Sequence, residues 1–87
     1  MIFHIDIGAS EKERRKNLRS LIANGDITFA GYKIGKIYGR LSCASGKRMK
    51  TKNRVFFQSE EEAAQNGYRP CGHCMKEKYT IWKAQQK

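Results

Sequence analysis

Apolar residues recur at helical spacing along two polar stretches of the chain. After Ser10, positions Leu18, Leu21 and Ile22 fall on one face of a helix that Gly25 would end, so we predict an amphipathic helix over residues 11–24. Ser10 and Glu13 form a capping box, in which each side chain accepts a hydrogen bond from a backbone amide that the first turn leaves unpaired.

The same signal recurs later in the chain. Ser59 and Glu62 predict the start of a short helix that Gly67 ends. A last helix is predicted from Met75 to about residue 84. Met75, Tyr79 and Trp82 fall on one stripe of that helix, and such a stripe is typical of core packing.

Short apolar stretches between these helices predict strands. Residues 26–38 fit a hairpin whose turn lies near Ala30 and Gly31, and Arg54–Phe57 fits a further strand. The alternating residues 2–7 fit a strand or an ordered arm, whereas residues 44–53 have the composition of a mobile loop. The chain of 87 residues is therefore expected to be a single α/β (α+β) domain over residues 1–87, with a few-stranded, mostly antiparallel sheet flanked by helices.

Composition limits the setting of such a domain. No apolar run approaches the length of about 20 residues that spans a membrane, and residues 1–10 do not resemble a secretory signal. We therefore expect a cytoplasmic protein with reduced thiols. Three cysteines also do not pair completely within one chain, which favours metal binding over a disulfide scaffold.

Charge indicates the class of partner. The chain carries 18 basic and 8 acidic residues, a net charge of +10. No Asp or Glu stands between Ile27 and Ser59. That window instead holds eight basic residues: Lys33, Lys36, Arg40, Lys47, Arg48, Lys50, Lys52 and Arg54. A stretch of one sign favours a polyanion, most often nucleic acid; a solvated basic face or an acidic protein partner are the alternatives.

The three cysteines predict a zinc site. Cys71 and Cys74 are spaced as Cys-x-x-Cys, which places two thiols on one turn, and Cys43 is able to add a third at about 2.3 Å from the metal. His4 is the preferred fourth ligand because it is unconstrained in sequence. His73 is the second choice because it lies inside the turn, and water or a carboxylate remains a further option.

An open fourth position would instead suggest catalysis by zinc-bound water. Pro70, Cys71 and Cys74 match half of the zinc deaminase signature, which also needs a Glu two residues after the upstream ligand. Cys43 is followed by Ala44 and Ser45, so the deaminase interpretation is rejected.

Four ordered segments, residues 36–43, 53–57, 59–64 and 67–74, resemble the metal-binding domain of the Ada DNA-repair protein family, with the likeness strongest over residues 27–80. The resemblance implies a small α/β fold in which four cysteines bind one Zn²⁺ ion and the first cysteine accepts a methyl group from a DNA methylphosphotriester. It matches Cys43, Cys71 and Cys74 to the other three ligands. It also implies that Arg40, the basic residues 47–52 and Arg69 face the DNA backbone.

The sequence departs from that family at Gly39, where the resemblance places the methyl-accepting cysteine. Glycine provides neither a ligand nor a nucleophile, so we expect no catalytic residue and lean against an enzyme. The hypothesis is a zinc domain that binds DNA phosphates with little regard to sequence; the alternatives are a methylphosphotriester repair module and a structural or protein-interaction zinc domain. The expected DNA contacts are Lys36, Arg40, Lys47, Arg48, Lys50, Lys52 and Arg69.

Overall fold

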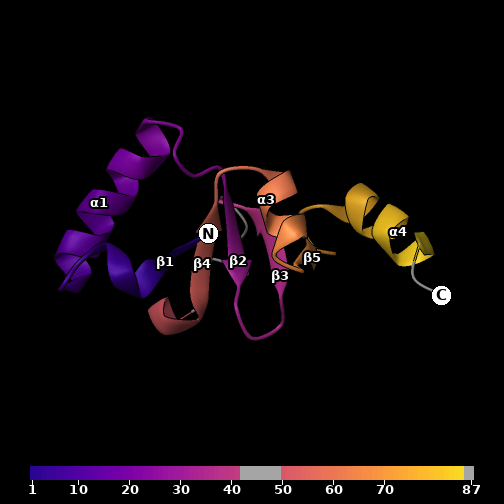
Figure 1. Ribbon diagram of the computed structural model, residues 1–87, viewed down its shortest axis with the longest axis horizontal. Coiled ribbons are helices and arrows are strands. Elements are labelled where there is room, and N and C mark those ends of the chain that lie inside the picture. Colours follow the sequence, from indigo (N-terminus) through magenta and orange to yellow (C-terminus); the bar gives the residue numbers. More distant parts are fainter. Residues whose placement is uncertain (42–49, 86–87) are drawn as a thin grey trace.

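A computed structural model describes residues 1–41 and 50–85 of the chain (Figure 1). Its strands are β1 (Ile2–Phe3), β2 (Phe29–Tyr32), β3 (Ile37–Arg40), β4 (Arg54–Phe57) and β5 (Arg69–Pro70). Its α-helices are α1 (Glu11–Ala23), α3 (Glu60–Gln65) and α4 (Lys76–Gln85), and its 3-10 turns are η1 (His4–Ile7) and η2 (Thr51–Asn53). The expected α+β class is confirmed. None of the helices in these two ranges combines the length and apolar character needed to cross a bilayer.

Both predicted helix starts are confirmed. The Ser10 Oγ accepts a hydrogen bond from the Glu13 amide at 3.2 Å, and the Ser59 Oγ accepts one from the Glu62 amide at the same distance. In return, the Glu62 carboxylate accepts a hydrogen bond from the Gln58 amide at 2.8 Å. These bonds supply acceptors for the amides that a first helical turn leaves without partners, so each helix begins where its capping serine stands.

The hairpin turn lies elsewhere than predicted. Ala30 and Gly31 are inside β2, and the chain reverses between Tyr32 and Ile37, where Lys36 has a φ of 52°. Gly31 is required by packing and not by a turn, because a Cβ there would lie 2.8 Å from the Phe57 ring.

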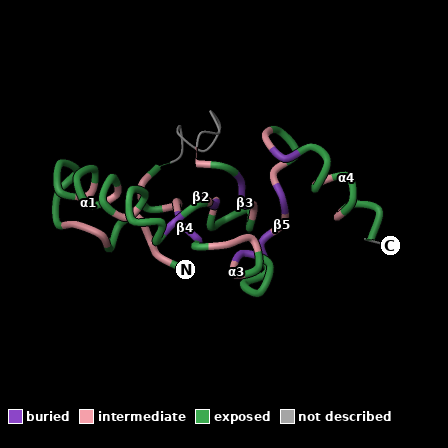
Figure 2. Tube along the Cα trace, turned by 90° about the horizontal axis from the view of Figure 1, so that it is seen from above, coloured by how far each residue is buried: buried purple, intermediate pink, exposed green. Residues whose placement is uncertain are grey.

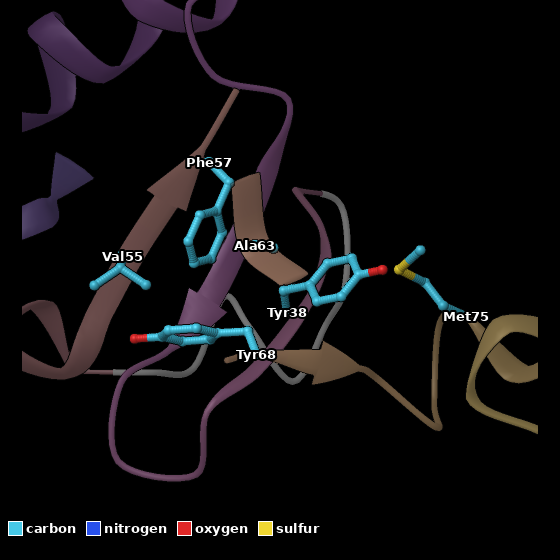
Figure 3. Packing of buried hydrophobic residues seen from close by; sticks show 6 residues of the cluster. All are labelled: Tyr38, Val55, Phe57, Ala63, Tyr68 and Met75. Atoms are coloured by element: carbon cyan, nitrogen blue, oxygen red, sulfur yellow. The ribbon is translucent and has the colours of Figure 1, made fainter. Parts of the chain in front are cut away.

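The strands form one mixed sheet in the order β1-β4-β2-β3-β5, in which only the β3–β5 pair is parallel. Val55 and Phe57 point to one face, where Tyr38, Tyr68 and Ala63 of α3 complete a buried cluster (Figure 3). Phe56 points to the other face and packs with Ile27 and Ala30; that cluster is covered by side chains of β1, η1 and α1 (Ile2, Ile7, Leu18 and Leu21) and by Leu41.

Helices α1 and α4 lie at opposite ends of the molecule (Figures 1 and 2). Helix α4 contributes no buried residue of its own. Met75, just before it, is buried as expected, but Tyr79 and Trp82 are only half-buried and stack on each other with ring centroids 5.9 Å apart. The expectation that this stripe forms core is therefore wrong for its last two members, because α4 extends away from the sheet.

Candidate metal centre

The Cys-x-x-Cys turn is attached to the sheet by its own backbone. Strand β5 pairs with β3, and the Cys71 amide continues the ladder by donating to the Tyr38 carbonyl at 2.8 Å. The Met75 amide then donates to the Cys71 carbonyl at 3.1 Å and closes the turn ahead of α4. We call residues 71–74 the knuckle; its position is fixed by β3.

Backbone amides point at both sulfur atoms of the knuckle. The His73 amide donates to the Cys71 Sγ, and the Arg40 amide of β3 donates to the Cys74 Sγ, each at 3.4 Å. These bonds hold the two sulfurs in place on the turn, and sulfur is a preferred ligand of zinc. Two half-buried sulfurs on one turn with amide donors fit half of a tetrahedral zinc site.

Gly39 lies directly against this sulfur pair. A Cβ built on Gly39 would be 2.8 Å from the Cys74 Sγ, 3.1 Å from the Cys71 Cβ and 3.9 Å from the Cys71 Sγ. The backbone of β3 therefore passes so close to the knuckle that a side chain at position 39 would contact the Cys74 sulfur and require it to shift. A residue in β3 at this position faces the metal half-site, as the resemblance to the Ada domain implies.

The third predicted ligand, Cys43, lies outside the described residues. Among residues 1–41 and 50–85, no group of three or more His, Cys, Asp or Glu side chains gathers as a metal site would require. The described chain shows Cys71 and Cys74 together, with β3 leading from Gly39 toward Cys43.

His4 is not brought to the knuckle. It begins η1 directly after β1, which is the edge strand opposite β5. Four interstrand spacings of about 4.8 Å separate the two edges by about 19 Å, far beyond the reach of one coordination shell. The imidazole instead packs edge-on against Phe56, with ring centroids 5.2 Å apart. The structure thus gives no support to His4 as a ligand of the same ion as Cys71 and Cys74, because the strand order separates residues that the sequence left free to meet.

His73 is exposed within the knuckle and lines a shallow cleft with Arg40 and Cys74. The other wall of the cleft carries an ion pair between Lys78 and Glu60. Burial raises the pKa of the Tyr38 phenol, and the charge of Glu60 adds to the rise while that of Lys78 opposes it.

The predicted DNA contacts divide into two groups. Lys36, Arg40 and Arg69 lie along β3 and β5, where the Arg69 amide donates to the Lys36 carbonyl at 2.8 Å. Lys50 directly precedes η2 and Lys52 lies within it. This turn contacts η1 near the opposite edge of the sheet. Lys47 and Arg48 lie outside the described residues.

Sequence reasoning missed the setting of Arg69. Its guanidinium lies 5.1 Å from the ring centroid of Tyr79 and 5.6 Å from that of Trp82. These cation–π contacts hold the side chain of an arginine that stands two residues before Cys71. The available signal was the Tyr79–Trp82 pair, three residues apart on a helix next to a basic strand, which was interpreted as core instead.

Comparison with known proteins agrees with this geometry. The profile of the metal-binding domain of Ada matches residues 21–77, which is well over half of the chain and includes all three cysteines. Neither the curated proteins nor the solved structures gave a match. The chain therefore belongs to the family of the zinc-binding domain of Ada.

Proposed function

We propose that this zinc domain binds DNA through the phosphate backbone, with little dependence on sequence, in the reducing environment of the cytosol. The observation that carries the proposal is the position of Arg40. Its backbone amide bonds to the Cys74 Sγ while the residue itself is exposed, so a cation stands at the rim of the metal half-site. Arginine suits this role because its guanidinium meets a phosphate with two parallel hydrogen bonds.

Charge supports the same partner. Within the described residues, Lys78 is the one Lys or Arg side chain that forms an ion pair with a carboxylate. Arg40 and Lys36 have no such pairing, and Arg69 is held by aromatic rings rather than by an acid. Cations left without carboxylates on a chain of net charge +10 are available to a polyanion.

The proposal includes the absence of methyl transfer. Gly39 stands where the family resemblance puts the methyl-accepting cysteine, and it has no side chain to be methylated. The two described cysteines stand at the positions that the resemblance assigns to zinc ligands other than the methyl-accepting one, and their sulfurs already accept backbone amides. Zinc, when bound, would hold the knuckle in place and neutralise its thiolates. Arg40 and Arg69 bind the DNA phosphates.

Fluorescence anisotropy with a labelled duplex over a range of salt concentrations tests DNA binding. If about five side chains neutralise phosphates, the slope of log K against log [salt] should be near −4 to −5. Replacing both Arg40 and Arg69 with Gln should make the slope less steep by about 2, since each phosphate contact contributes about 0.9. The matched control is the double change Lys12→Gln and Lys16→Gln, which removes the same charge from exposed positions of α1. Equal effects of both double variants, or no salt-dependent binding by the wild type, would overturn the proposal in favour of a structural or protein-interaction domain.

Methyl transfer is tested separately by mass spectrometry after incubation with DNA that carries methylphosphotriesters. The intact mass of the protein should not change. A gain of one methylene would contradict this part of the proposal and restore the repair-module alternative.

A further inference from the structure

A second cationic cluster lies at the sheet edge opposite the knuckle. It joins His4 of η1, Arg14 of α1 and Arg54 of β4. The Arg54 guanidinium lies 5.0 Å from the centroid of the Phe56 ring, and the His4 imidazole packs edge-on against that same ring at 5.2 Å. The Arg14 Nη1 donates to the Gly8 carbonyl at 3.2 Å, which anchors that side chain beside η1.

The three side chains leave hydrogen-bonding atoms without partners. The Arg14 Nε, the Arg54 Nε and the His4 Nδ1 are all buried, and none of them has a hydrogen-bond partner among the described residues. A buried N–H with no acceptor costs more than a hydrogen bond typically contributes, so native proteins rarely leave several together. An acceptor from outside the chain would satisfy these nitrogens.

The charges of the two arginines also lack compensation. Burial lowers the pKa of His4, and the positive charges of Arg54 and then Arg14 lower it further. Neither arginine forms an ion pair with a carboxylate in the described parts of the chain. Of the acids nearest in sequence, Asp6 is exposed, and Glu13 accepts the Ala9 amide at 3.0 Å.

We propose that His4, Arg14 and Arg54 form a binding site for a phosphate group. Arg54 and His4 lie against the same Phe56 ring. Arg14 is bonded to the Gly8 carbonyl at the end of η1, and both β4 and α1 contact η1. A phosphate oxygen accepts hydrogen bonds from guanidinium N–H groups and from an imidazole N–H. The three residues are partly exposed although the three nitrogens themselves are buried, so a phosphate that bonds to these nitrogens has to move the side chains that cover them. Arg54 on β4 and His4 after β1 lie about three and four interstrand spacings from β5, which leads into the knuckle, and this site does not depend on DNA binding at the knuckle.

The test uses the zinc-loaded full chain and inorganic phosphate, with chloride at matched ionic strength as the reference. Phosphate that binds only the folded state should raise the Tm of the wild type in proportion to log(1 + [phosphate]/Kd). Arg14→Gln and Arg54→Gln should each lose at least half of that rise. Arg19→Gln, an exposed position on the same helix, should keep it.

Proton NMR of the two histidines keeps the proposal testable if Arg54→Gln fails to fold. Phosphate should shift the His4 ring signals saturably and leave those of exposed His73 unchanged. Equal shifts of both histidines, an equal Tm rise in all four proteins, or no rise in the wild type would overturn the site. A duplex oligonucleotide then distinguishes the source: movement of the His4 signals assigns the site to DNA phosphates, and movement by inorganic phosphate alone assigns it to a free phosphate ligand.

Discussion

Replacing Gly39 with alanine should weaken zinc binding through direct contact with the ligand sulfurs. The added methyl group would lie 2.8 Å from the Cys74 Sγ and 3.1 Å from the Cys71 Cβ. A shift of either cysteine would disturb existing bonds, because the Cys71 amide donates to the Tyr38 carbonyl of β3 and the Cys74 Sγ accepts the Arg40 amide. Forcing one methyl group into such a site typically costs about 1–3 kcal/mol. If that cost falls on the metal-bound state, zinc affinity drops by about 5- to 150-fold.

The matched control is Gly31→Ala in the neighbouring strand β2. A Cβ there meets the Phe57 ring at 2.8 Å and the Val55 Cγ2 at 3.0 Å, so the crowding is equally severe but involves no sulfur. Because zinc binding and folding are coupled, both variants should lower the apparent zinc affinity in a chelator competition. The variants differ in the metal environment. Only Gly39→Ala should change the visible spectrum of the cobalt-substituted protein, since only there does a ligand sulfur have to move.

Two results would refute this reasoning. One is a Gly39→Ala protein with wild-type zinc affinity and an unchanged cobalt spectrum, which would mean that β3 does not lie against the knuckle as described. The other is the same spectral change in Gly31→Ala, which would show that crowding acts through the sheet in general. Either outcome would also remove the geometric basis for placing position 39 beside the metal.

Three further predictions concern stability. Phe57→Ala empties a fully buried position and should cost about 3–5 kcal/mol in urea denaturation of the zinc-loaded protein; a cost below about 1 kcal/mol would contradict its core position. Ser10→Ala removes the acceptor of the Glu13 amide and should cost about 1 kcal/mol in the same assay, whereas Ser10→Asp should retain most of the stability. The N-terminal ammonium and then the Gln58 amide lower the pKa of Glu62, so its stabilising effect is present above its unfolded pKa of about 4.3 and is lost as pH falls through the folded value. Glu62→Gln should therefore flatten the acid end of a stability-against-pH curve, and an unchanged curve would exclude this carboxylate as its cause.

Local signals explain why the helices and the knuckle were predictable. A capping serine, its glutamate and the apolar spacing that follows act within one or two turns, so Ser10 and Ser59 mark helix starts whatever the rest of the chain does. The Cys-x-x-Cys spacing likewise brings two thiols to one turn by itself.

Non-local packing explains the errors. The strand order β1-β4-β2-β3-β5 depends on pairing between distant parts of the chain, so no single segment predicts it. This order separates His4 from the knuckle. In the sequence, Gly31 looks like a turn residue. The reason for a glycine here is that a Cβ would meet the Phe57 ring, and this contact exists only when β2 and β4 pair. The turn itself uses Lys36 at positive φ, where glycine would be the expected choice.

The two ends of the sheet handle charge in opposite ways, and this difference ties the fold to its proposed partners. At the knuckle, the backbone amides of His73 and Arg40 donate to the two sulfurs, so these donors have partners within the protein. At the β1 edge, buried donors of Arg14 and Arg54 face no acceptor among the described residues. A buried donor without an acceptor destabilises the free protein, and an anion that supplies the acceptor binds more tightly by the amount of that relief. The proposed phosphate site therefore depends on donors that the described residues leave unsatisfied at one edge of the sheet, whereas the amides at the proposed zinc site are already paired with sulfur.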